Sequence, residues 1–205
     1  FFTGGFFTPR QFNWVIGLAL FGLILAANFT GYLLPWDQLS YWAITISTGM
    51  LTYVPVVGEA LVGFVRRGAD IGSATLLTFF TFHTTVIPAA LIVLMAFHFW
   101  RVRKAGGVIT PRAIGEEVED KPPKVLFLPN LFVRELAQGC AVVATVVVLA
   151  LLAEAPLQAA ANPGMSPNPA KAPWYFLGFQ ELLIHLHPVF AIFVWPLLGV
   201  VVLIC

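Results

Sequence analysis

Charged residues are scarce in this chain, since only 10% of its 205 residues are Asp, Glu, Lys or Arg. Soluble domains carry about 25% of such residues. The chain is also 59% hydrophobic, with a mean hydropathy of +0.88. The shortage of charge therefore excludes an ordinary soluble domain and indicates an integral membrane protein. The net charge is only +1 and no basic stripe exists, so we expect no nucleic-acid partner.

Cysteine is scarce as well. Cys140 and Cys205 both lie inside apolar runs, where packing residues are more typical than a disulfide. No signal peptide, internal repeat or low-complexity tract is present. The chain opens without Met and ends inside an apolar run, and we interpret it as a piece of a longer protein.

Long apolar runs are plentiful. A spanning helix needs about 20 mostly apolar residues. The runs that reach or approach this length are 13–34, 74–100, 131–152 and one that begins near His187. The runs 39–51 and 56–65 are too short to span and predict helices at the membrane interface, the second of them stopped at Gly68. We therefore predict an all-α fold, a transmembrane helical bundle.

The cations predict the orientation. Loops alternate between the two sides of the membrane, so eight cations share one side: Arg10, Arg101, Arg103, Lys104, Arg112, Lys121, Lys124 and Arg134. Only Arg66, Arg67 and Lys171 lie on the other. The positive-inside rule places the first side in the cytoplasm. The corner 31–40 (GYLLPWDQLS) and the Pro-rich loop 155–173 then lie on the outer side.

Two histidines fall in the second predicted span. His83 and His98 are fifteen residues apart. In an α-helix, this separation places the two side chains within about 60° of each other around the axis and about 22 Å apart along it. One imidazole therefore lies near each side of a layer about 30 Å thick. Each histidine either bonds a carbonyl of a neighbouring helix or is one axial ligand of a haem, which gives two haems across the membrane. They are too far apart to share a zinc ion.

Two glycines in the first span match this spacing. Gly17 and Gly31 are fourteen residues apart, or about 21 Å, and face within about 40° of each other. A glycine lets another group approach the backbone closely. Ordinary packing of small residues between helices is the alternative. Because the glycine pair repeats the histidine pair, the haem interpretation becomes the favoured one.

These residues carry a family resemblance. The stretches GYLLPWDQLSYWA (31–43), FFTFHTTVIPAALIVLMAFHFWRVRKAG (79–106) and APWYFLGFQELL (172–183) resemble cytochrome b of the quinol:cytochrome c oxidoreductases, the cytochrome bc family. The WDQ and YWA variants and the fifteen-residue histidine interval look most like the photosynthetic branch. That branch usually splits the protein after the histidine-bearing helix, whereas this chain continues, as in the respiratory type.

The resemblance implies two haem b groups. His83 would ligate the low-potential haem near the outer face, and His98 the high-potential haem near the cytoplasm. Each second axial histidine would come from two earlier helices that this sequence does not contain. Arg10, Asn13 and Trp14, at the inner end of the first span, would meet the propionates of the inner haem. Alternatively, Arg10 is a surface residue that anchors the loop.

The resemblance also implies a reaction and its partners. Quinol would be oxidised at an outer pocket built by the corner 31–40 and by Pro173, Trp174 and Tyr175. One electron would pass to a Rieske-type iron–sulfur protein and then to a c-type cytochrome or plastocyanin-like acceptor. The other would cross the haems to an inner quinone, with protons translocated. We expect a multi-pass protein of a bacterial inner membrane, in a homodimeric complex. Residues 1–106 would belong to the N-terminal haem domain and 107–205 to the C-terminal domain.

The sequence departs from the family pattern at the outer pocket. The family usually reads PEWY, and its Glu is thought to accept a quinol proton, but Pro173 stands at that position. Glu181, His185 or Tyr32 with water would substitute, although a solvated or helix-pairing Glu181 is the alternative.

Three further positions are notable. Thr78 stands where the family often has Arg. Ala43 stands where mitochondrial relatives carry Gly, and its methyl would narrow the pocket for methoxyacrylate inhibitors. For Asp37 we favour a structural role in the turn over proton transfer.

Two other functions remain open. The chain could be a di-haem membrane anchor of a formate dehydrogenase or hydrogenase, although such an anchor does not need PWDQ or APWY. It could also be a haem-free channel or transporter subunit, which a reduced-minus-oxidised spectrum would distinguish.

Overall fold

The computed structural model describes residues 6–7, 9–108, 126–167 and 171–204. Within these residues the chain is helical, and the only strand-like pairing is an isolated bridge between Asp37 and Ala160. The predicted all-α class is therefore confirmed. The chain forms two compact units, Phe1–Thr110 with Gln158–Cys205, and Pro111–Leu157. Arg112, Lys121, Lys124 and Cys205, used in the sequence arguments, lie outside the described residues.

Among the described residues, three helices are long and apolar enough to cross a membrane. The first is α1 (Gln11–Tyr32), and the second is the 32-residue helix Ser73–Lys104. The third, Phe127–Leu152, belongs to the other compact unit and contains α6 (Phe132–Leu152). The run after His187 forms a shorter apolar helix, Phe190–Ile204, whose last part is α8 (Trp195–Ile204).

The helix Ser73–Lys104 contains one irregular turn. It consists of α4 (Ser73–Thr81), a π-helical turn (Phe82–Val86) and α5 (Ile87–Lys104). Pro88 follows this turn and has no N–H to donate, and its ring would clash with the carbonyl four residues earlier in a regular helix. The same arrangement recurs where the π-turn Phe190–Val194 precedes Pro196. The prolines thus account for the positions of both turns.

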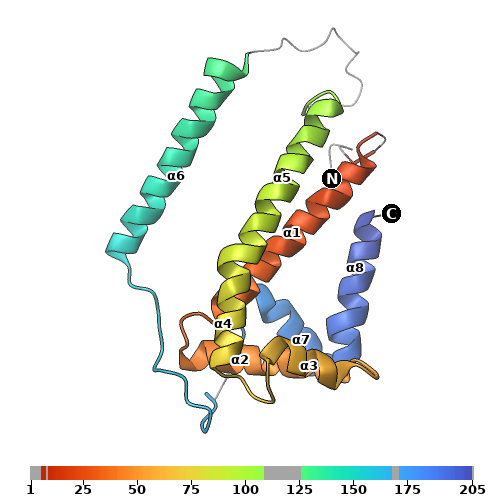
Figure 1. Cartoon of the computed structure of the whole chain (residues 1–205), viewed down its shortest axis with the longest axis vertical. Coiled ribbons are helices and arrows are strands. Elements are labelled where there is room, and N and C mark those ends of the chain that lie inside the picture. The colour runs from red at the N-terminus through yellow and green to blue at the C-terminus, as the bar shows by residue number, and fades with distance from the viewer. Residues whose placement is uncertain (1–5, 8, 109–125, 168–170, 205) are drawn as a thin grey trace. The chain divides into compact units, whose positions relative to one another are not determined.

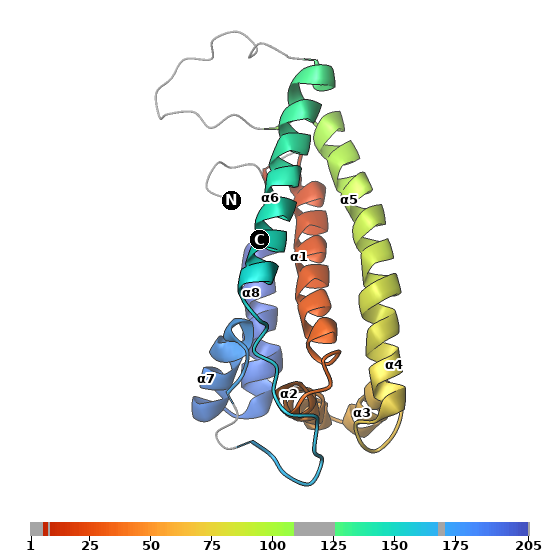
Figure 2. The same ribbon diagram turned by 90° about the vertical axis from the view of Figure 1, so that its left-hand side faces the viewer.

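In the first unit, α1 packs along α5, and the short helices lie at one end of this pair (Figures 1 and 2). These short helices are α2 (Gln38–Gly49), a 3-10 turn (Met50–Tyr53), α3 (Gly58–Arg66) and, after a 3-10 turn at Trp174–Phe176, α7 (Leu177–His185). Both predicted short helices therefore exist, while their depth in a membrane stays a prediction.

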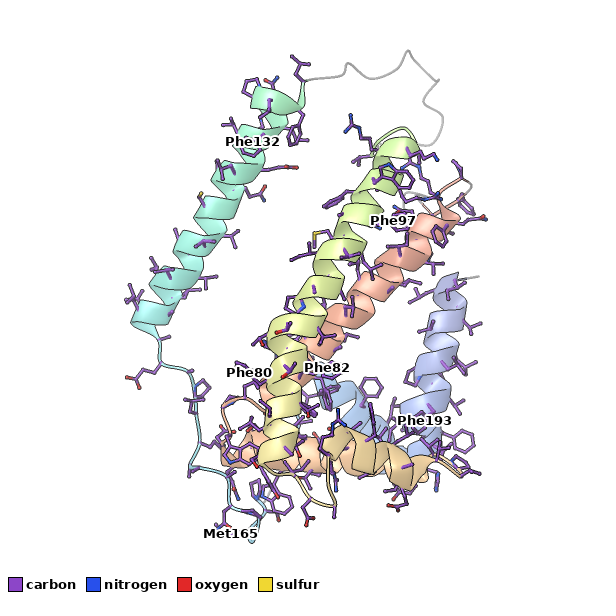
Figure 3. The ribbon with its side chains drawn as sticks, in the orientation of Figure 1. Phe80, Phe82, Phe97, Phe132, Met165 and Phe193 are labelled. Atoms are coloured by element: carbon purple, nitrogen blue, oxygen red, sulfur yellow. The ribbon has the colours of Figure 1, made fainter. Side chains whose placement is uncertain are left out.

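The buried core of this unit lies at the same end. It consists of Leu33, Tyr41, Ile44, Ile71 and Phe79, with Phe29, Trp36 and Trp42 packed against it. By contrast, α1 and α5 expose large apolar side chains along most of their length. Phe80 and Phe82 leave the helix on opposite sides, as a separation of two residues requires (Figure 3). Such exposed apolar faces suit lipid or further helices.

The predicted end of α3 is corrected by one residue. The helix stops at Arg66, and Arg67, not Gly68, takes the left-handed conformation with φ of 59°. A non-glycine residue pays about 1–2 kcal/mol for this conformation. The guanidinium of Arg66 offsets such a cost locally, because it donates to the buried Thr48 hydroxyl at 2.8 Å and to the Thr45 carbonyl at 2.9 Å.

Cys140 is a free thiol on α6, so it forms no disulfide among the described residues. Its role as a packing residue stays a prediction.

Candidate functional site

His83 lies against Gly31. A Cβ built on Gly31 would come within 2.6 Å of the Cε1 atom of the His83 ring and 3.2 Å of its Nε2 atom. Real side chains do not approach this closely. Only glycine therefore fits opposite this imidazole.

His98 lies against Gly17 in the same manner but with more room. A Cβ on Gly17 would lie 3.5 Å from the Cε1 atom of His98, an ordinary van der Waals contact. The two glycines on α1 thus face the two histidines on the neighbouring helix pairwise. The coincidence of spacing noted in the sequence is a physical pairing of residues.

The π-turn explains why the two intervals differ by one residue. The histidines are fifteen residues apart and the glycines fourteen. A π-turn adds one residue to a helix. The turn Phe82–Val86 includes His83 and continues toward His98, so the extra residue falls within the interval between the two histidines. The fifteen residues therefore act as about fourteen helical positions, so the angle between the imidazoles is about 40° rather than 60°.

The inner end contains unsatisfied polar atoms. The Nδ1 atom of His98 and the Oδ1 atom of Asn13 are buried and have no hydrogen-bond partner among the described residues. Asn13 precedes Gly17 by one helical turn, on the same face of α1. Buried polar groups without partners are costly. No three metal-binding side chains gather in the described part of the chain, so each histidine would act as a single ligand. A glycine notch beside an imidazole fits a flat group such as haem.

The other two predicted inner residues make contacts elsewhere. Arg10 donates from Nη1 to the Gly107 carbonyl at 2.7 Å and from Nη2 to the Ala105 carbonyl at 2.8 Å. It therefore anchors the turn that follows α5, as one of the two sequence-based alternatives predicted. The Trp14 indole N–H donates to the Leu203 carbonyl, which links α1 to the end of α8.

The outer corner is a hydrogen-bonded clamp. Asp37 caps α2, since its Oδ1 accepts from the Ser40 N–H at 2.8 Å. Its Oδ2 accepts from the Gln158 N–H at 3.1 Å. Gln38 extends the same clamp, because its Oε1 accepts from the Asn162 N–H at 2.7 Å and its amide donates to the Met165 carbonyl. Figure 3 shows Met165 in the loop beside this corner.

Backbone bonds complete the clamp. The Gln38 N–H donates to the Ala159 carbonyl at 2.8 Å, and the Ala161 N–H donates to the Trp36 carbonyl at 3.1 Å. Trp36 itself has φ of 52°, a left-handed conformation that is rare for a bulky residue. The polar residues of the corner thus hold the Pro-rich loop in place.

Asp37 is held as a carboxylate. Burial would raise its pKa, but hydrogen bonds from the Ser40 and Gln158 backbone and the Ser40 side chain outweigh burial, and its pKa lies below the ordinary value of 3.8. A lowered pKa means that the carboxylate stabilises the fold above about pH 3.8 and loses this effect as the pH falls through the lower, folded value. These contacts support the structural role that we favoured for Asp37.

We expect Asp37→Ala to destabilise the protein by about 1–3 kcal/mol, because it removes a helix cap and leaves the Gln158 N–H without its acceptor. Thermal unfolding of the detergent-solubilised protein at neutral pH measures this loss. Asp70→Ala is the matched control, since Asp70 is exposed and should change stability by about 0.5 kcal/mol or less. Equal stability of both variants would contradict the clamp.

A cavity of about 510 Å³ lies between the corner and the segment 171–196. Its volume suits a small organic ligand. The lining is mostly apolar and comes from α1, α2, α7 and the residues around them: Leu25, Ala26, Phe29, Tyr32, Leu39, Trp42, Ala43, Ile44, Ile46, Ser47, Met50, Lys171, Ala172, Pro173, Phe176, Phe179, Gln180, Leu183, Ile192 and Pro196.

Some predicted site residues meet at this cavity. Tyr32 and Pro173 line it, and the Tyr32 ring contacts the Tyr175 ring edge-on, with centroids 6.4 Å apart. Burial raises the pKa of Tyr175 above its ordinary value of 10.0, so its phenol keeps its proton at neutral pH. Trp174 is 82% exposed and does not line the cavity.

Glu181 lies outside the cavity lining. Its carboxylate is 3.2 Å from the Nε2 atom of His185, one helical turn on, and both side chains are more than two-thirds exposed. This geometry matches the helix-pairing alternative. A role for Glu181 in proton transfer stays a prediction.

Sequence reasoning missed two polar lining residues. Among the described residues that line the cavity, Lys171 is the only charged one. Gln180 is fixed there because its side-chain oxygen accepts from the Ala172 N–H at 2.8 Å. The signal was available, because Lys171 stands two residues before Pro173 in the same motif. Where the family motif carries an acid, this chain thus places a cation nearby.

Comparisons with known proteins agree with this geometry. The family model for cytochrome b (N-terminal)/b6/petB matches residues 1–172. Cytochrome b6 of Porphyra purpurea is 46% identical over 106 residues, which are 52% of this chain and 49% of that protein. Cytochrome b6 of Synechococcus elongatus is 44% identical over the same shares. A solved chain described as a hyperthermophilic respiratory Complex III has a TM-score of 0.69 at 26% identity, over 88% of this chain and 49% of that one.

The chain belongs to the cytochrome b (N-terminal)/b6 family. The family resemblance predicted from the sequence is therefore confirmed. Membership implies haem b as the cofactor. The chain spans about half the length of the curated relatives it matches.

Proposed function

We propose that this chain is the haem-bearing part of a cytochrome b subunit that oxidises quinol in a cytochrome bc-type complex. The observation that carries this proposal is the pairwise arrangement of Gly31 with His83 and of Gly17 with His98. A haem-free transporter would have no need for it. A membrane anchor of a dehydrogenase would not need the cavity beside the corner 31–40.

The two histidines would each hold one haem b. His83 would hold the outer haem and His98 the inner haem through their imidazoles, and the resemblance assigns each haem a second histidine from earlier helices of the family. Gly31 and Gly17 would leave space beside them. Asn13 would lie beside the inner haem, and Arg10 would fix the turn there. When bound, the haems supply one-electron transfer between the two sides of the membrane.

The cavity is the proposed quinol site. Its apolar walls would take the ring and the start of the isoprenoid tail, and Pro173 and the Asp37 clamp would keep its shape. Tyr32 lies in the wall and would hydrogen-bond a quinol hydroxyl, with water or the Glu181–His185 pair passing the proton to the outside. Lys171 would favour the anionic form of the bound quinol.

The remaining assignments rest on family membership. The partners would be a Rieske-type iron–sulfur protein, a c-type cytochrome or plastocyanin-like acceptor, quinone at an inner site, and a second copy of the complex. The protein would cross a bacterial inner membrane with the corner 31–40 outside, and protons would be released on that side. Residues 1–106 and 107–205 would be parts of the N-terminal and C-terminal domains.

A reduced-minus-oxidised spectrum of the purified complex tests the proposal. We expect the α band of two b haems, with one lost in His83→Leu and the other in His98→Leu. A wild-type complex without this band, or with a band that both variants retain, would refute it.

Substitution of the cavity phenol tests the proton path. We expect Tyr32→Phe to lower quinol oxidation by about tenfold or more and to shift its pH profile, because a positioned proton-transfer group contributes about 10²–10⁴-fold. Glu181→Gln is the comparison, measured over the same pH range. If only Glu181→Gln shifts the pH profile, proton transfer would be assigned to the Glu181–His185 pair instead of Tyr32. If neither variant shifts the profile, both groups would be excluded from proton transfer.

A further inference from the structure

The Nδ1 atom of His83 has two oxygen neighbours on α1. It lies 3.0 Å from the Ala27 carbonyl oxygen and 3.3 Å from the Thr30 hydroxyl oxygen. The Thr30 hydroxyl also lies 2.8 Å from the Ala26 carbonyl, one helical turn earlier, and donates its own proton there. Its lone pairs therefore remain available to the histidine.

These neighbours settle the tautomer of His83. A backbone carbonyl can only accept a hydrogen bond. The Nδ1 atom must therefore carry the proton, and it donates to the Ala27 carbonyl and the Thr30 oxygen together. The Nε2 atom is then the nitrogen whose lone pair is free for a metal.

His98 lacks such support. Its Nδ1 atom is buried and has no hydrogen-bond partner among the described residues. The two candidate ligands thus differ in the hydrogen bonding of the Nδ1 atom, which is present in His83 and absent in His98 among the described residues. A partner that accepts from the distal N–H raises the basicity of a ligating imidazole and fixes its orientation.

We propose that Thr30 is a positioning residue for His83: with the Ala27 carbonyl it accepts the Nδ1 proton, orients the ring and makes His83 a stronger electron donor to iron than His98. This proposal rests on the proposed haem-binding function. The stronger donor favours oxidised iron, which would account for the low potential that the family resemblance implies for the outer haem. The asymmetry is built by the first span, not by the histidines themselves.

Potentiometric titration of the α band in the intact complex tests the proposal. The transition lost in His83→Leu identifies the outer haem. We expect Thr30→Val, which keeps the side-chain shape but removes the hydroxyl, to raise the potential of the outer haem by about 59 mV. A shift of this size corresponds to a tenfold change in the one-electron equilibrium between oxidised and reduced haem. Tenfold is the lower end of the change in metal affinity that follows loss of a hydrogen-bond partner of a metal ligand. The potential of the inner haem should not move.

Thr30→Ser is the matched control, because it restores the hydroxyl and should restore the potential. Loss of the outer haem alone in Thr30→Val, regained in Thr30→Ser, would also support the proposal. An unchanged potential in Thr30→Val, an equal shift of both haems, or no rescue by Ser would overturn it. If Thr30→Val fails to assemble, Thr30→Ala is titrated under the same criteria. A wild-type complex without haem would instead refute the proposed function.

Discussion

Replacement of Gly31 by Ala should remove the outer haem while the inner haem stays. The added Cβ would lie 2.6 Å from the His83 ring, so one of the two must move. The ring is not free to swing away, since its Nδ1 atom is bonded to α1. Overpacking of this kind costs about 1–3 kcal/mol, and the ring that must yield is the proposed haem ligand. The reduced-minus-oxidised spectrum of the complex should show about half the wild-type haem.

Gly17→Ala is the internal control for that experiment. The same methyl group, on the same helix and opposite the other histidine, would meet His98 at 3.5 Å, which is ordinary contact. Both haems should therefore remain in Gly17→Ala. If the two alanine variants keep or lose haem alike, the pairing of glycines with histidines does not control binding.

The pairing of the two glycines with the two histidines could be predicted because its signal is periodic, while haem binding at these residues stays a prediction. Residues on one helix face can be found by counting, and Gly17, Gly31, His83 and His98 are all on regular helices except for one turn. That turn was not predicted. Nothing in a count of 100° per residue detects the extra residue at Phe82–Val86, although Pro88 two positions later was a usable signal.

The corner was predicted only in part, and the reason is the range of its contacts. A helix start at Asp37, with Ser40 three residues on, is a local signal. The partners Gln158 and Asn162 are more than 120 residues away. Such pairing depends on the path of the intervening chain, which side-chain chemistry alone does not determine. These contacts also explain why a membrane protein carries Asp37 and Gln38 at this corner, because both side chains form hydrogen bonds to a distant loop.

The cavity shows the same limit. The segment Pro173–Tyr175 was recognised as a motif, but its neighbours Lys171 and Gln180 were not assigned to the site. Their position in the lining depends on the three-dimensional proximity of α1, α2 and α7, which the sequence does not reveal. Glu181 was one of three candidates for the proton acceptor, beside the alternative of a helix-pairing acid. The structure pairs it with His185, away from the cavity.

Filling this cavity should abolish quinol oxidation without loss of haem. Ala43 lines the cavity from α2, and Ala43→Phe would place a benzyl group where the quinol ring is proposed to bind. We expect about a hundredfold loss of quinol oxidation, the effect of displacing a reactant from its working position. The two proposed haems should remain reducible by dithionite with unchanged spectra, because Ala43 is on α2 whereas the two histidines are on the helix Ser73–Lys104. Steady-state quinol oxidation in membranes measures the loss.

Ala96→Phe separates this effect from general overpacking of the bundle. Ala96 is exposed on α5 and lies about 160° around the helix from His98 and about 120° from His83 once the π-turn is counted, so a phenyl ring there should meet neither haem site nor cavity. It should oxidise quinol at the wild-type rate. A fully active Ala43→Phe variant would show that quinol is oxidised elsewhere. Loss of haem in Ala43→Phe would show that α2 shapes the haem sites as well, in which case the cavity and the outer imidazole form one site.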